Sequence, residues 1–184
     1  MQKAEETFRI WFIQPINALR LSRGSVSGDG TFIAFATCFF LYERYAMAVL
    51  KKSKQEKAEF YCQIASDFNT DQETAKAFWI AMRHGILHQG MPVTEKRKGE
   101  QKPYKWKFND NYFRSVELEE RDGVNWLKIN PWRIIDNVIS LWERNLNILE
   151  ESINFPWAEV YQDEVGDSNS IVTGAASGLT QTPS

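Results

Sequence analysis

The chain has 184 residues, of which 43% are hydrophobic and 14% aromatic, and it contains two cysteines. This length and apolar content suffice for one domain with a substantial core, which excludes a disordered body, and two cysteines do not make a disulfide framework. The formal net charge is −2, but residues 158–184 carry four acids and no lysine or arginine, so residues 1–157 carry +2. Such mild basicity is compatible with a nucleic-acid partner without requiring one.

Helical patterns dominate the sequence. Apolar residues at spacings of three and four predict helices over residues 3–20, 31–52, 54–68, 71–88 and 131–153. Pro15 predicts a kink or break in the first helix, and residues 21–30 are a loop by their Gly, Ser and Asp content. The second helix is apolar nearly all round, which predicts a central place in a bundle. Asn69-Thr70-Asp71 predicts a turn with an N-cap before the helix over 71–88, and Asn130-Pro131 predicts an N-cap before the last helix.

The pattern changes between the last two helices. Residues 104–108, YKWKF, alternate apolar and basic side chains, and Arg121-Asp122-Gly123 separates two further strand-like runs. We therefore expect a small antiparallel β-hairpin or three-stranded meander over about residues 104–129, inserted into the helical body. From residue 158 the chain is acidic and then rich in Gly, Ser and Thr, so we expect a folded domain over 1–157 and a flexible tail over 158–184.

Both histidines of the chain fall in one short stretch, Arg83-His84-Gly85-Ile86-Leu87-His88, just before Gly90 and Pro92 end the predicted helix. Arginine offers a permanently charged, planar set of donors suited to phosphate, and histidine takes and gives protons near neutral pH. Together Arg83 and His88 suit metal-free cleavage of a phosphodiester by the neighbouring ribose 2′-OH. No cofactor and no metal are needed for this chemistry.

The helical spacing has a consequence for assembly. Five residues place His88 about 140° around the helix from Arg83, so either the long arginine bridges the angle or His88 lies where the helix is ending. The reaction needs both a base and an acid, whereas one copy of the motif supplies a single histidine at position 88. A two-fold dimer that brings two such pairs together would supply both, so we expect a homodimer.

The stretch Arg83 to His88 resembles the R-x4-6-H motif of HEPN domains, with a polar residue directly after the arginine. HEPN domains are bundles of four to five helices that commonly pair through a cleft holding both motifs. Many are metal-independent endoribonucleases, found as toxins, in phage defence and in RNA processing. The resemblance implies that Arg83 and His88 are the catalytic pair, that His84 assists, and that Glu43, the acid on the core helix, matches a family carboxylate. It also allows an antitoxin partner of nucleotidyltransferase type, and the β insertion resembles a lineage-specific addition.

Other interpretations of the same residues stay open. Glu43 can form a structural ion pair with Arg44 or Arg83, and the motif can be an ordinary helix end whose histidine is favoured by the helix dipole. His84 and His88 are four residues apart on one helical face, as in a metal pair, but the sequence offers no third ligand at a telling distance. The domain can also be a non-catalytic HEPN module that dimerises or binds a ligand in a defence or toxin–antitoxin system.

The basic strand is a candidate RNA-binding element. Lys102, Lys105 and Lys107 alternate with aromatic residues that include Trp106. Lysines would follow phosphates while aromatics stack on bases. The competing interpretation is a half-buried strand with a solvated lysine face.

The sequence predicts a cytoplasmic protein without a membrane segment. Cys38 and Cys62 lie in apolar or helical surroundings, which is typical of reduced, buried thiols. The first residues contain early acids and no continuous apolar run, so we expect no secretory signal. The apolar run in 31–50 is interrupted by Glu43 and Arg44, which favours a core helix over a membrane span.

Overall fold

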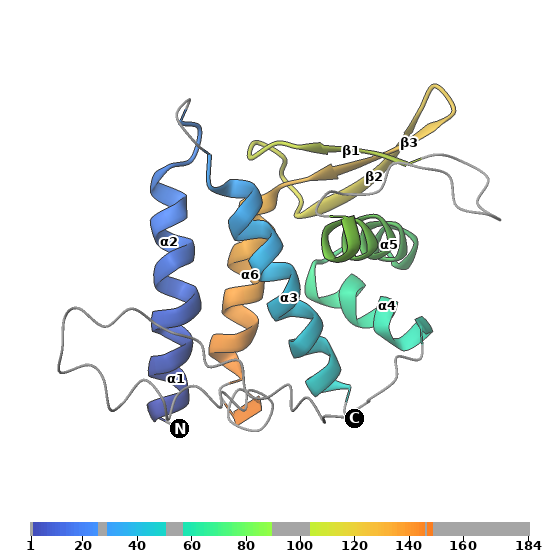
Figure 1. Cartoon of the computed structure of the whole chain (residues 1–184). Coiled ribbons are helices and arrows are strands. Elements are labelled where there is room, and N and C mark those ends of the chain that lie inside the picture. Colours follow the sequence, from blue (N-terminus) through green and yellow to red (C-terminus); the bar gives the residue numbers. More distant parts are fainter. Residues whose placement is uncertain (1, 26–28, 51–56, 90–103, 146, 149–184) are drawn as a thin grey trace, which may run out of the picture. The chain divides into compact units, whose positions relative to one another are not determined.

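Helices make up most of the described chain, and a small mixed sheet of three strands follows the last but one of them (Figure 1). The computed structural model describes residues 2–25, 29–50, 57–89, 104–145 and 147–148, without the side chains of 2–4, 57, 84, 87–89 and 104. The predicted mainly α class with a small β insertion is therefore confirmed. The tail predicted over 158–184 and the basic loop before residue 104 lie outside the described residues.

The helical elements agree closely with the predicted ranges. They are α1 (Gln2–Phe8), the π-helical turn η1 (Arg9–Ile13), α2 (Gln14–Leu21), α3 (Thr31–Val49), α4 (Lys57–Asp67), α5 (Gln72–Gln89) and α6 (Pro131–Arg144). The strands are β1 (Tyr104–Phe108), β2 (Val116–Arg121) and β3 (Val124–Ile129). Figure 1 shows α2, α6 and α3 side by side, with the sheet lying over α5.

Pro15 does not break the first helix as predicted, and a π-helical turn precedes it instead. Pro15 lies in the first turn of α2, directly after η1, where the Gln14 amide donates five residues back to the Arg9 carbonyl. Proline has no N–H to continue the normal pattern, so the chain widens into one π turn before α-helix resumes. The first helix therefore remains continuous in direction but changes its hydrogen bonding at this point.

The core gathers around α3, as its apolar composition predicts. Much of its surface is buried, and aromatic rings from other elements pack against it. The ring centroids of Phe35 and of Phe108 in β1 are 5.0 Å apart, and the rings of Phe39 and of Trp79 in α5 stack with centroids 5.1 Å apart. Trp142 of α6 donates its indole N–H to the Leu41 carbonyl at 3.2 Å. Burial of these large rings is the main stabilising contribution to the fold.

By length and composition alone, α3 could also cross a membrane. Its most apolar 18-residue stretch has a mean hydropathy of 1.3, and 44% of that stretch is buried inside the structure. A core helix of a soluble protein passes the same test. In the described part of the chain, α3 contacts α6, α2 and α4.

The start of α5 follows the predicted capping. Asp71 accepts the backbone N–H of Thr74 at 2.8 Å and its hydroxyl at 2.6 Å, which satisfies amide donors that have no partner inside the helix. The preceding turn closes with Asn69 at a φ of 50°, a conformation that asparagine tolerates. This short connection brings α4 and α5 into contact with each other.

The predicted hairpin is confirmed, but the predicted meander is wrong. β2 and β3 pair antiparallel across a two-residue turn in which Asp122 and Gly123 have φ values of 54° and 72°, as an Asp-Gly hairpin requires. β1, however, pairs parallel to β3, and the strand order is β1-β3-β2. The seven residues between β1 and β2 are long enough to carry the chain past the end of β3 to its far side, which a tight meander turn cannot do.

Asn130 fixes this crossing connection to the last helix. The residue is 2% exposed, and its side chain accepts a hydrogen bond from the Arg133 backbone N–H, as the N-cap of α6. The same side chain donates hydrogen bonds from Nδ2 to the backbone carbonyls of Asp110 and Tyr112 at 2.7 and 2.9 Å. α6 ends at Arg144, residues 147–148 are again helical, and residues 149–153 of the predicted helix lie outside the described residues. Asn145 ends α6, because its backbone N–H bonds to Trp142 and its side chain to the Leu141 carbonyl.

Candidate functional site

An ion pair joins the two helices that carry the predicted site. Arg83 of α5 donates from Nε to Oε1 of Glu43 on α3 at 2.9 Å, with 29% of the Arg83 side chain and 16% of the Glu43 side chain exposed. The sequence offers Arg44 and Arg83 as ion-pair partners of Glu43, and the structure shows a contact with Arg83. The contact is partly shielded from water, so it holds the guanidinium more firmly than a surface pair would.

Packing around each residue explains why the two meet. On α5, Met82 and Ile86 are buried on either side of Arg83, which sets the rotation of the helix. On α3, Tyr42 is buried next to Glu43. The apolar faces of both helices turn inward, and the charged pair lies at the border of this core, where the guanidinium keeps access to solvent.

The two histidines are placed by their backbone only. His84 and His88 belong to α5, which continues to Gln89, whereas Gly90 and Pro92 lie outside the described residues. The helix thus includes the whole motif, and His88 lies about 7.5 Å further along the axis than Arg83 and about 140° around it. The side chains of His84 and His88 lie outside the described residues, so their contacts are not part of this geometry.

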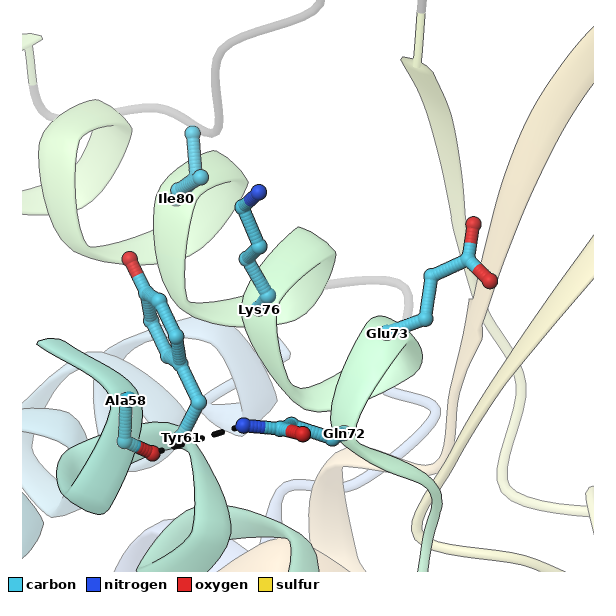
Figure 2. Close-up of a pocket in the computed structure, with 6 residues that line it drawn as sticks. All are labelled: Ala58, Tyr61, Gln72, Glu73, Lys76 and Ile80. Atoms are coloured by element: carbon cyan, nitrogen blue, oxygen red, sulfur yellow. Dashed lines mark hydrogen bonds between the residues drawn. The ribbon is translucent and has the colours of Figure 1, made fainter.

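A surface groove of about 760 Å³ lies between α4 and α5. Figure 2 shows Tyr61 of α4 and Lys76 of α5 extending over it, while Gln72 reaches the Ala58 carbonyl at 3.5 Å. Its described lining residues include neither Arg83 nor Glu43. The groove therefore shares a helix with the motif without containing the ion pair.

The strand that was predicted to bind RNA divides its residues between two faces. The side chains of Lys105 and Lys107 are exposed, whereas Trp106 packs 5.2 Å from Phe108 on the face turned toward α3. Successive side chains of a strand alternate in this way. Lys105 and Lys107 therefore come together, Trp106 does not join them, and Lys102 lies outside the described residues.

Another tryptophan stands with the lysines and was not singled out from the sequence. Trp126 pairs with Lys105 in the β1–β3 register, and Lys105 Nζ lies 5.2 Å from its ring centroid. A pocket of about 380 Å³ on this face is lined by Lys107, Tyr112, Glu119, Arg121, Trp126 and Lys128. The only sequence signal for Trp126 is its position in VNWLKIN, which becomes informative only once the register with β1 is known.

Other ionisable groups of α3 and α4 lie outside this site. Burial raises the pKa of the Cys38 thiol to about 12, while Cys62 is exposed, so the prediction that both thiols are buried is wrong for Cys62. Tyr42 donates to Asp67 at 2.8 Å, and Gln63 donates to the same carboxylate at 2.9 Å. Burial nevertheless raises the pKa of Asp67 above its ordinary value. Within the described part of the chain, no three His, Cys, Asp or Glu side chains gather closely enough to hold a metal ion.

Comparisons of the chain with protein-family models, curated proteins and solved structures find no match.

Proposed function

We propose that the protein is a metal-independent endoribonuclease of HEPN type, acting as a toxin or phage-defence component. The observation that carries the proposal is the Glu43–Arg83 pair at 2.9 Å, with the arginine on the same helix as His84 and His88. This contact supports the expectation that Glu43 corresponds to the carboxylate that many HEPN domains carry on an earlier core helix. A helical domain with this arrangement also agrees with the coarse architecture of the family.

Each residue has a separate role in the proposed reaction. His88 removes the proton of a ribose 2′-OH, and the oxygen attacks the adjacent phosphorus while the 5′-oxygen of the next nucleotide leaves and is protonated. Arg83 stabilises the negative charge on the pentacoordinate phosphorus. Glu43 holds the arginine through Nε, and a guanidinium has further N–H donors for phosphate oxygens. His84 assists at the same helical face as His88.

The reaction needs an acid as well as a base, so a homodimer is part of the proposal. Two copies of α5 facing one another would bring one His88 near the attacking oxygen and the other near the leaving oxygen. RNA is the substrate, no cofactor takes part, and the protein acts in the cytoplasm. An antitoxin of nucleotidyltransferase type is a proposed partner.

The test is cleavage of single-stranded RNA by the purified full chain in EDTA. We expect Arg83→Ala to slow cleavage about 100- to 1,000-fold and His88→Ala about 100-fold or more. Lys76→Ala is a matched control, because Lys76 is an exposed cation on the same helix and away from the ion pair. Absence of cleavage in EDTA, or equal rates in wild type and both site variants, refutes the proposal.

The same ion pair favours a second candidate function, a non-catalytic HEPN module that dimerises or binds a ligand. A partly buried arginine–carboxylate bridge between α3 and α5 can serve stability alone. This candidate predicts a folded dimer without nuclease activity, in which His88→Ala changes neither assembly nor ligand binding.

A further inference from the structure

The outer face of the sheet exposes an aromatic residue among cations. Trp126 lies on the central strand β3, yet it is only half-buried, with Lys105 beside it on β1. Tyr112 stands nearby, with Lys128 Nζ 6.0 Å from its ring centroid. The core face of the same strands already contains Trp106, Phe108 and Leu127, so the core does not require a further ring on the outer side.

The charges of this face favour a polyanion. Strand alternation and the register place Lys105, Lys107, Lys128 and Arg121 on it, opposed by Glu117 and Glu119. Glu119 forms an ion pair with Lys128. Arg121 also forms an ion pair with the neighbouring Asp122 at 3.6 Å. With this acid counted, the face carries a local charge of +1, although the whole chain carries −2. Lysines often protect the edges of a sheet, but such protection does not require tryptophan and tyrosine among them.

We propose that this outer face, centred on Trp126, binds single-stranded RNA. One base stacks on the Trp126 indole and a neighbouring base on Tyr112. The ammonium of Lys105 leaves the ring face for a phosphate, and Lys107 and Arg121 contact phosphates on either side. Stacking on aromatic rings with lysines along the backbone is how single strands are bound without sequence preference.

The place of this face in the fold defines its role in the proposed function, on which this part of the inference rests. α5, with the motif, packs against β2 and β3 on the core side of the sheet (Figure 1). Strand alternation puts Trp126 on the other side, because its neighbour Leu127 is buried. The face therefore binds RNA outside the cleavage centre. Its loss raises KM and leaves kcat nearly unchanged.

Binding is tested with the full chain and a fluorescein-labelled 2′-O-methyl oligouridylate, which cannot be cleaved by 2′-OH attack. We expect Trp126→Ala to weaken binding by about 10-fold or more, and Trp126→Phe to restore most of the affinity. Lys105→Gln and Lys107→Gln weaken binding and each lower the slope of log affinity against log salt by about 0.7. Lys76→Ala, on α5, is the control.

The outcomes separate this inference from the proposed nuclease. Unchanged affinity in Trp126→Ala that melts like wild type, together with unchanged affinity in both lysine variants, overturns the inference. Equal displacement of the oligonucleotide by polyglutamate also overturns it and indicates an acidic protein segment as the ligand. Weaker binding in Trp126→Ala without any RNA cleavage by the wild type supports RNA binding by this face and refutes the nuclease. Cleavage by the wild type with unchanged binding in Trp126→Ala and in both lysine variants supports the nuclease and refutes RNA binding by this face.

Discussion

Arg83 and Glu43 are 40 positions apart in the chain, and the Arg83 Nε lies 2.9 Å from the Glu43 Oε1. The contact connects α3 with α5 at the beginning of the last two turns of α5, so the most apolar helix of the core holds the arginine of the motif. Because 29% of the arginine side chain is exposed against 16% of the glutamate side chain, the carboxylate is the more shielded partner. Glu43 is therefore placed to position Arg83.

We predict that Glu43→Ala slows RNA cleavage about 10- to 100-fold, because Arg83 loses the partner that fixes its side chain. The same variant lowers the free energy of unfolding by about 1–3 kcal/mol, since a half-buried guanidinium loses its acceptor. Glu43→Gln keeps an oxygen that accepts from Nε and recovers most of the activity. Initial rates in EDTA and urea unfolding measure both effects.

The matched control is Glu143→Ala, which removes an exposed acid from α6. It is expected to leave rate and stability close to those of wild type. If Glu43→Ala cleaved RNA as fast as Glu143→Ala, the positioning role of Glu43 would be wrong.

The two thiols are expected to differ in reactivity. Cys38 is buried and its pKa is raised to about 12, so almost no thiolate forms at pH 8, whereas Cys62 is exposed on α4. One equivalent of iodoacetamide should react with the folded chain, and peptide mass analysis should locate it at Cys62. Cys62→Ser should abolish the reaction until urea exposes Cys38. Rapid alkylation of Cys38 in the folded protein would contradict the described core.

Asp67 gives a pH dependence of stability with a defined sign. Burial raises the pKa of this carboxyl above 3.8, so between 3.8 and the raised value the folded state binds more protons than the unfolded state. The free energy of unfolding contributed by Asp67 therefore falls as the pH rises through that window. Asp67→Asn keeps an acceptor for the Tyr42 hydroxyl and removes this dependence.

Urea unfolding of wild type and Asp67→Asn across pH 3.5–7 measures the difference. We expect the variant to gain stability relative to wild type with increasing pH. A difference that stayed constant over this range, or that changed in the opposite direction, would show that burial does not dominate at Asp67.

Asn130 should be among the most sensitive polar residues of the fold. Asn130→Ala removes the N-cap of α6 and two hydrogen bonds to the connection that crosses the end of β3, so we expect a loss of about 2–3 kcal/mol in the free energy of unfolding. Asn137→Ala, which removes one side-chain bond to Ser115 from the same helix, should cost about 1 kcal/mol or less. Equal losses in the two variants would argue against the role given to Asn130.

Local sequence patterns predict the features that depend on residues a few positions apart, such as helix caps and tight turns. Capping residues such as Asp71 and Asn130, and the Asp122-Gly123 turn, act within a few positions, and the structure has them as expected. The interruption of the last helix at Asn145, which bonds back to Trp142 and Leu141, has no signal in the apolar spacing, because that spacing continues after Arg144. Boundaries are decided by such single contacts more than by periodicity.

The pairing of strands that are distant in the chain is harder to predict from the sequence. The parallel pairing of β1 with β3 depends on how residues 109–115 cross the sheet, and no spacing within YKWKF reveals it. Without this pairing the sequence places Trp106 with the lysines, although it packs inward, and gives no sign that Trp126 stands among them. The Glu43–Arg83 contact was within reach because an acid on a core helix needs a partner, and Arg83 was one of two cations considered.

The central claim, cleavage by the ribose 2′-OH without a metal, is tested most directly by the chemistry of the new 3′ end. RNA cut by the wild-type chain in EDTA should be analysed by mass spectrometry, together with an RNA that carries a single 2′-deoxy substitution at a mapped cleavage site. The account predicts a 2′,3′-cyclic phosphate at every cut and no cut at the substituted site. A free 3′-OH end, or equal cleavage of the substituted RNA, would contradict it.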